Sequence, residues 1–170
     1  LVGINEAEGS QFNDTLIGTE NEANWFQGDL GDDLIAAGSG SKSAATYLDI
    51  ASYEDATGGV TVDLSLTLDH TITYVSDGVT LAHFSGDPYG TSSGADGHDT
   101  LLNIEGVSGS KYADLIIGGA QTAFVAANCG DDTVAMGTHF NDQMVIDGGN
   151  GYDTLSFTSD GSTTYNLHNV

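Results

Sequence analysis

Aspartate recurs in this chain at one fixed place, the sixth position of glycine-rich turns that are each followed by a short apolar run. The clearest such turns are 28–33, 94–99, 127–132 and 148–153, and looser copies with an aromatic residue in place of a glycine are 9–14 and 109–114. A glycine-rich turn can direct main-chain carbonyls inward, because glycine reaches conformations closed to other residues. Carbonyls and carboxylates are the oxygen ligands that Ca²⁺ prefers. The spacing therefore predicts calcium binding at the turns.

The aspartates at the sixth position are the first candidates for calcium ligands. They are Asp14, Asp33, Asp99, Asp114, Asp132 and Asp153. Three further carboxylates within the turns are either extra ligands or solvated charges: Asp29, Asp32 and Asp131. The turn glycines that are candidates as main-chain ligands are Gly28, Gly31, Gly149 and Gly151. Asn24 and Ala123 stand where an aspartate is expected, so we expect weak or no binding at their turns and fewer ions than turns.

The charge of the whole chain agrees with cation binding. Its 170 residues include 25 Asp and Glu but only 2 Lys and Arg, which gives a formal net charge of −23. Such a charge repels nucleic acid and anionic membrane surfaces, and it destabilises a compact state unless cations neutralise it. An acidic surface also suits a protein from a high-salt habitat. The single cysteine, Cys129, excludes an internal disulfide, and no apolar run is long enough to insert into a membrane.

Other residue types that could perform chemistry lack suitable partners. The five histidines are scattered, without the spacing of zinc ligands. Cys129 has no identifiable His or Asp partner that would activate it as a nucleophile. The many aspartates could imitate a glycosidase pair, but the register of the turns already accounts for their positions. We therefore expect no enzymatic activity.

The chain contains an internal duplication of about 100 residues, since residues 1–18 align without a gap with 101–118. Further along the chain, residues 28–36 match residues 127–135, and residues 49–64 match residues 153–167. Within each copy, six-residue turns alternate with three-residue strands, and only the middle residue of such a strand should face the core. The predicted core residues are Leu16, Phe26, Ile35, Leu101, Ile116, Val134 and Leu155.

The turns resemble the nonapeptide G-G-x-G-x-D-x-U-x of the RTX family, the hemolysin-type calcium-binding repeat, and the best copy is GGNGYDTLS from Gly148 to Ser156. The resemblance implies an all-β fold: a right-handed parallel β-roll, or β-solenoid, in which two nonapeptides form one coil. In such a roll each Ca²⁺ lies between successive turns on one edge. By this resemblance 9–14 would stack on 28–33, and 109–114 on 127–132. Asp99 and Asp153 would join them if their coils are in register.

We expect two β-roll blocks, 1–64 and 94–170, on either side of a β-rich insert at 65–93. Alternating residues from 60 to 84, with Asp77-Gly78 as a turn, predict an antiparallel hairpin. It would serve as a decoration, a cap or a contact surface.

Three functions fit this reading. The first is a calcium-rigidified unit of a secreted adhesin, surface layer or extracellular filament, and the duplication favours it because arrays extend reach. The second is a secretion or binding module appended to an extracellular enzyme such as a lipase, protease or polysaccharide epimerase. The third is a catalytic β-helix acting on polysaccharide. Because the chain opens in the middle of the repeat pattern, we expect end-to-end self-association or covalent tandem neighbours.

Overall fold

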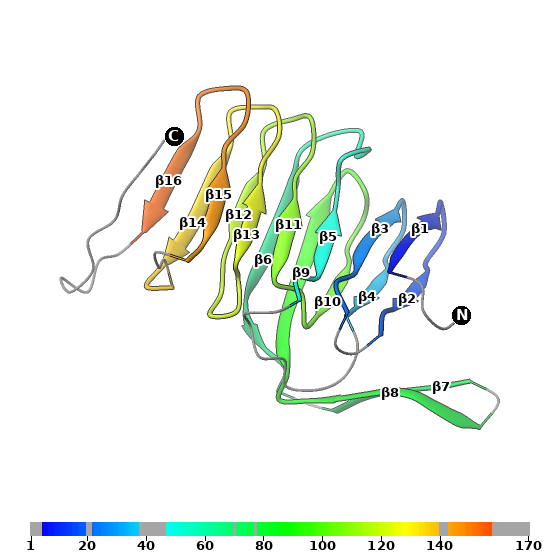
Figure 1. Cartoon of the computed structure of the whole chain (residues 1–170). Helices are drawn as coiled ribbons and strands as arrows, with labels where there is room; N and C mark the ends of the chain where they lie inside the picture. Colours follow the sequence, from blue (N-terminus) through cyan, green and yellow to red (C-terminus); the bar gives the residue numbers. More distant parts are fainter. Residues whose placement is uncertain are drawn as a thin grey trace.

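The computed structural model describes residues 5–19, 22–37, 47–69, 71–76, 78–139 and 143–157. Within these residues it contains sixteen strands and no helix. The strands form a parallel β-solenoid whose coils follow one another along a single axis (Figure 1). The all-β solenoid predicted from the repeats is therefore confirmed. A helix long and apolar enough to cross a membrane is not found in the described part of the chain.

One face of the solenoid is a six-stranded sheet in which every pairing is parallel. In spatial order its strands are β1 (Glu6–Ser10), β3 (Trp25–Asp29), β5 (Ile50–Ser52), β11 (Gly106–Ser108), β13 (Phe124–Ala126) and β15 (Val145–Asp147). The other face is an eight-stranded sheet, in the order β2 (Thr15–Ile17), β4 (Leu34–Ala36), β10 (Thr100–Leu102), β9 (Pro88–Gly94), β6 (Val60–Thr67), β12 (Leu115–Ile117), β14 (Thr133–Gly137) and β16 (Thr154–Phe157).

The middle residues of the short strands point between the two sheets and form the core. Phe26, Ile35, Leu101, Ile116 and Val134 are buried there, and the two remaining predicted core residues, Leu16 and Leu155, are partly buried against them. The core predicted from the repeat register is therefore confirmed. Leu16 and Leu155 lie on β2 and β16, the outermost strands of the eight-stranded sheet.

Two strands of the eight-stranded sheet have no counterpart on the other face. β9 runs antiparallel between β6 and β10, and β10 is parallel to β4. β9 could not be recognised from the sequence, because its inward positions are occupied by the small residues Gly90 and Ser92, both buried. The pairing of β10 with β4 brings the turn at 94–99 onto the turn at 28–33.

The alternating stretch around Asp77-Gly78 forms an antiparallel hairpin of β7 (Thr71–Ser76) and β8 (Val79–Ser85). Asp77 itself lies outside the described residues. The first part of that stretch, Val60–Thr67, instead belongs to the roll as β6, parallel to β12.

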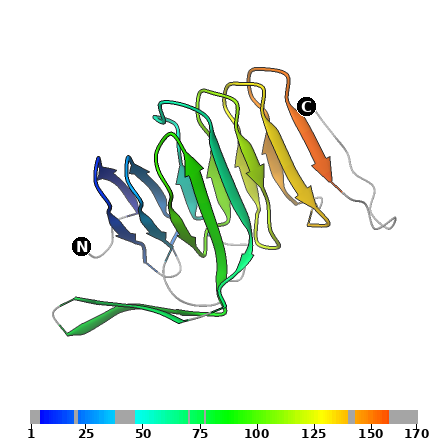
Figure 2. The same cartoon turned by 180° about the vertical axis from the view of Figure 1, so that it is seen from behind.

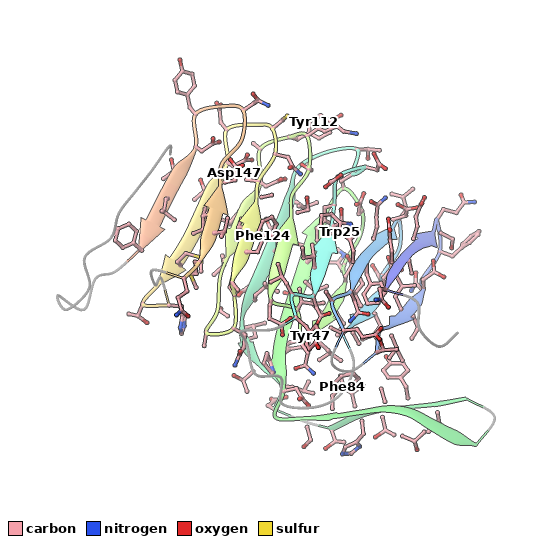
Figure 3. All side chains as sticks on the ribbon, viewed as in Figure 1. Trp25, Tyr47, Phe84, Tyr112, Phe124 and Asp147 are labelled. Atoms are coloured by element: carbon pink, nitrogen blue, oxygen red, sulfur yellow. The ribbon has the colours of Figure 1, made fainter. Side chains whose placement is uncertain are left out.

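This hairpin covers part of the outer face of the eight-stranded sheet. Phe84 and Ala82 pack there with Leu34, Ala36 and Leu102, and all five are buried (Figure 3). The expectation that only middle residues are buried is therefore wrong for β4 and β10, since their outward residues lie under the hairpin. Away from these contacts, β7 and β8 extend past β1 and β2 in both views (Figures 1 and 2).

Candidate metal site at the turn edge

The glycine-rich turns lie on one edge of the solenoid in two stacks. The first stack contains 9–14, 28–33 and 94–99, and the second contains 109–114, 127–132 and 148–153. Tyr112, on the second stack, marks this edge in Figure 3. The predicted stacking of 9–14 on 28–33 and of 109–114 on 127–132 is confirmed. Asp99 and Asp153 are also in register, as the last aspartates of their stacks.

A row of hydrogen bonds joins the aspartates at the sixth position. In the first stack the main-chain N–H of Asp14 donates to Oδ1 of Asp33 (2.8 Å), and that of Asp33 to Oδ1 of Asp99 (3.0 Å). In the second stack Asp114 donates in the same way to Asp132 (2.8 Å), and Asp132 to Asp153 (3.2 Å). Each turn therefore holds the carboxylate of the next, and all six aspartates of the sixth position lie in the two rows.

The fifth positions form a second row, which explains two of the extra carboxylates. Oδ1 of Asp32 accepts the N–H of His98 (3.1 Å), and Oδ1 of Asp131 accepts the N–H of Tyr152 (3.0 Å). Both aspartates are exposed, so they join successive turns at the surface. Asp29 differs from them, since it accepts a hydrogen bond from Nε2 of Gln27 (2.7 Å).

The middle turn of each stack contains a carboxylate oxygen that has no partner. Oδ2 of Asp33 and Oδ2 of Asp132 are buried, and neither accepts a hydrogen bond. The two residues are 3% and 1% exposed. A buried carboxylate oxygen without a partner costs free energy, because it has lost its water and gained nothing in return. A cation beside each oxygen would remove this cost.

In the first turn of each stack, a serine donates hydrogen bonds to the carboxylate of the sixth-position aspartate. Oδ2 of Asp14 accepts both the N–H (2.6 Å) and the hydroxyl (2.8 Å) of Ser10. Asp114 accepts the N–H of Ser110 on Oδ2 (2.6 Å) and its hydroxyl on Oδ1 (2.7 Å). In the middle turns the serine is replaced by a residue in the left-handed region, Asp29 (φ 63°) or Asn128 (φ 74°). Gly-Ser at the start of a turn was therefore a usable sequence signal.

The last aspartate of the first stack, Asp99, accepts hydrogen bonds from two residues that lie outside the repeats. Oδ2 of Asp99 accepts the hydroxyl of Ser92 (2.7 Å) and the hydroxyl of the buried Tyr53 (3.1 Å). Burial raises the pKa of the Tyr53 phenol well above its usual value, and the Asp99 carboxylate adds to this, so the phenol remains a donor. Asp33 is therefore the sixth-position aspartate of this stack that has a buried carboxylate oxygen, Oδ2, without a hydrogen-bond donor.

The carboxyl groups around Asp33 make ionisation unfavourable. Burial, followed by the neighbouring Asp99, Asp14 and Asp29, raises the pKa of Asp33 to about 6. Burial and then Asp99 likewise raise the pKa of Asp96 to about 6. Burial also raises the pKa values of Asp99 and Asp132. Crowded, desolvated carboxylates of this kind favour a bound cation.

Sequence reasoning missed Asp96, which is buried and whose pKa is raised in part by the charges of Asp99, Asp29 and Asp33. Its main-chain oxygen accepts the N–H of Gly31 (2.8 Å). Asp96 occupies a free position of its turn, so only the stacking of 94–99 on 28–33 shows that it belongs to the site.

The turn glycines allow the turns to stack at main-chain distance. Gly97 (φ 118°) lies against the main-chain oxygen of Gly31, and Gly151 (φ 148°) against that of Gly130, so a Cβ atom has no room at either position. Gly149 lies in the same way against Asn128, and the Cα of Gly28 faces Oδ2 of Asp33. At Gly97, Gly149 and Gly151 a main-chain oxygen of the neighbouring turn therefore lies where a side chain would otherwise stand, and at Gly28 the Asp33 carboxylate does.

The opposite edge carries a related row in which an amide replaces the aspartate. Nδ2 of Asn24 donates to the main-chain oxygens of Thr19 (3.3 Å) and Glu22 (3.0 Å) and to Oδ1 of Asp49 (2.6 Å). The N–H of Asp49 donates to Oε2 of Glu105 (3.1 Å). The amide thus donates to oxygens that could otherwise coordinate a cation. Asp49 and Glu105 were missed because they lie outside the nonapeptides.

Across the described residues, no three or more His, Cys, Asp or Glu side chains are grouped as a metal centre. An ion at the turns would therefore be coordinated by main-chain oxygens together with one or two carboxylates. A cavity of about 650 Å³ lies near the opposite edge, between Leu66, Asp87, Glu105 and His139, and contains none of the predicted ligands.

No protein-family model matches the chain, and no curated protein matches it.

The serine of the first turn can be tested separately from any ion. Ser110→Ala removes the hydroxyl bound to Asp114, and we expect a loss of about 1–2 kcal/mol in the free energy of unfolding. Because Asp114 keeps the N–H of residue 110, the number of bound ions should not change. Urea unfolding measures the first quantity and equilibrium dialysis with calcium the second. A change in ion number would contradict the role assigned to the serine.

Proposed function

We propose that this chain is a calcium-binding, calcium-stabilised structural module of the RTX type. It would work outside the cell or at its surface, in an adhesin, a surface layer or an extracellular filament. The observation that carries the proposal is the buried, unpartnered Oδ2 atom of Asp33 and of Asp132, each in the middle of a stack of acidic turns.

The oxygens at these places suit Ca²⁺ better than other common metals. Ca²⁺ accepts 6–8 oxygen ligands in flexible geometry, whereas Mg²⁺ requires a near-ideal octahedron and Zn²⁺ favours nitrogen and sulfur. Carboxylate oxygens of Asp33 and Asp96 and nearby main-chain oxygens would hold one ion. Asp132, with main-chain oxygens of its turn and the next, would hold the other. When bound, the ions supply positive charge to turns that otherwise repel one another.

The distribution of donors predicts two ions rather than one for each turn. Serines satisfy Asp14 and Asp114, and Tyr53 and Ser92 satisfy Asp99. A structural role for the two ions follows from their position, since they would join turns that form the edge of the solenoid. Extracellular modules commonly bind calcium with dissociation constants near 10⁻⁴–10⁻³ M, so such a chain would bind ions after export.

Loss of one carboxylate should remove one ion. In equilibrium dialysis at saturating calcium, we expect two ions for the wild type and one each for Asp33→Asn and Asp132→Asn. Asp63→Asn is the matched control, because it removes the same charge from a carboxylate that accepts its hydrogen bonds from Ser65, two residues away. If all three variants lose calcium equally, general charge rather than these sites attracts the ion.

A further inference from the structure

The cavity near the opposite edge lies where the chain leaves the roll to form the β7–β8 hairpin. Residues 64–67, at the end of β6, and residues 85–88, which lead from β8 into β9, form part of its lining. Figure 1 shows the hairpin leaving the roll at these ends of β6 and β9. The connections that follow β10, β12 and β14 complete the described lining with Asn103, Glu105, Gln121 and His139, together with Ala120.

The size of the cavity is that of a small-molecule site. Its volume of about 650 Å³ falls within the range of roughly 300–1,000 Å³ that such sites occupy. Main-chain contacts fix its shape. Gly119 lies against the main-chain oxygen of Leu64, so a Cβ atom has no room there. The N–H of Leu68 donates to the main-chain oxygen of Asp87 (3.1 Å), which joins the segment after β6 to the segment before β9.

The acidic and amide side chains of the lining are positioned by hydrogen bonds within the protein. Oδ2 of Asp87 accepts the N–H of Ser85 (2.6 Å), and its Oδ1 accepts Nδ2 of Asn103 (3.5 Å). Oε2 of Glu105 accepts the N–H of Asp49 (3.1 Å). Asn103 and Glu105 are buried, and the backbone of Asn103 is in the left-handed region (φ 55°). Such a conformation costs free energy and persists where the surrounding structure requires it.

Other polar groups of the lining have capacity left for a ligand. A carboxylate can accept about four hydrogen bonds, and Asp87 accepts the two just described. The side chains of Thr67 and Gln121 are exposed and make no hydrogen bond within the described part of the chain. Leu66, which is 39% exposed, and Pro88 add apolar surface to the same lining.

This lining disfavours anions, apolar molecules and metal ions. Asp87 and Glu105 would repel an anion, since no Lys or Arg occurs among the described residues around the cavity. An apolar ligand would take water from the polar groups and leave them without partners. No three metal-ligating side chains are grouped in the described residues, and no carboxylate oxygen of the described lining is buried without a partner, unlike those of Asp33 and Asp132.

We propose that this cavity binds a short neutral saccharide. Sugar hydroxyls both donate and accept hydrogen bonds, so they donate to Asp87 and exchange hydrogen bonds with Thr67 and Gln121. The C–H face of a sugar ring covers Leu66 and Pro88. The site goes beyond the proposed calcium-stabilised role and is independent of it, because none of the predicted calcium ligands lines the cavity.

Binding of neutral sugars at saturating calcium tests the proposal. Saturation-transfer nuclear magnetic resonance screens glucose, galactose, mannose, N-acetylglucosamine, cellobiose and lactose, and isothermal titration calorimetry measures the affinity of those that bind. We expect at least one of them to bind with a dissociation constant of about 1 mM or lower. Glucuronate and glucosamine, which add one negative or one positive charge to the sugar, are the comparison probes. Glucuronate should bind more weakly than glucose.

Two variants locate the bound sugar. Gln121→Ala removes an exposed amide that the fold does not use, and Asp87→Asn removes a charged acceptor at nearly constant shape. We expect the dissociation constant to rise several-fold for the first and about tenfold or more for the second. Asp55→Asn is the matched control, because it removes the same charge from an exposed residue that pairs with Lys111. Circular dichroism checks that each variant is folded, and Gln121→Ala decides the question if Asp87→Asn does not fold.

Each outcome decides between the proposals. Failure of every neutral sugar to bind the folded protein would overturn the saccharide site and leave the proposed function standing. Unchanged affinity in the cavity variants would also overturn it, because the sugar would then lie elsewhere. Tighter binding of glucosamine than of every neutral sugar would assign the cavity to a cationic ligand instead. Absence of bound calcium in equilibrium dialysis would count against the proposed function alone.

Discussion

Excess chelator is expected to unfold the roll, and added calcium is expected to refold it. Without cations the oxygens of Asp33 and Asp132 remain buried without partners, within a chain of net charge −23. A ligand present at a hundred times its dissociation constant stabilises the folded state by about 2.7 kcal/mol for each site. Two such sites contribute about 5 kcal/mol, which is comparable to the whole stability of many domains.

Far-ultraviolet circular dichroism and thermal melts, in chelator and across a calcium titration, measure this effect. Sodium chloride of equal ionic strength is the control, because it screens charges without occupying the sites. We expect the salt to recover only part of the β signal, and Asp33→Asn to need more calcium than Asp63→Asn. An unchanged melting temperature in chelator would show that the stacked turns are stable without ions.

Acidification in chelator is expected to stabilise the fold, the reverse of ordinary acid denaturation. Asp33 and Asp96 have pKa values of about 6 in the folded chain, raised from 3.8. Between these values the folded state binds more protons than the unfolded state, so its stability rises as the pH falls. The gain begins as the pH falls through about 6 and is complete below the unfolded pKa of 3.8. Protons then take over the neutralising role of the cation.

Melting temperatures measured in chelator from pH 7 to pH 4 test this sign. We expect the wild type to gain stability over that range and Asp33→Asn to gain less, because its amide is neutral throughout. With saturating calcium the dependence should weaken or reverse, since protons then compete with a bound ion. A steady loss of stability on acidification in chelator would falsify the assignment of the buried carboxyls.

The sequence predicted those parts of the molecule that depend on local repetition. The register of turn and strand identified the core residues, and the resemblance to the RTX repeat aligned Asp14 with Asp33 and Asp114 with Asp132. It could not show that 94–99 stacks on 28–33, because that contact joins residues 66 apart through the pairing of β10 with β4. The role of Asp96 and the donation from Tyr53 to Asp99 depend on the same long-range pairing.

Other features were missed because their residue types carry no strong signal. β9 places Gly90 and Ser92 at inward positions, where apolar side chains usually reveal a strand. Asn24 stands where an aspartate ligand was expected, but its amide nitrogen donates hydrogen bonds to three oxygens of the opposite edge. The burial of the outward residues Leu34 and Leu102 could not be predicted, because the hairpin residues that pack on them are distant in the sequence.

The two unmatched strands, β9 and β10, also set the path of the solenoid. On one face β3 and β5 are direct neighbours, while on the other β4 and β6 are separated by β10 and β9. Two extra strands lengthen that face by about 10 Å, similar to the distance between two packed sheets. The coil of β3 and β4 and the coil of β5 and β6 must therefore lie further apart on the eight-stranded face than on the six-stranded face. A string of such units would change direction once in every unit, and would follow a curve rather than a straight line.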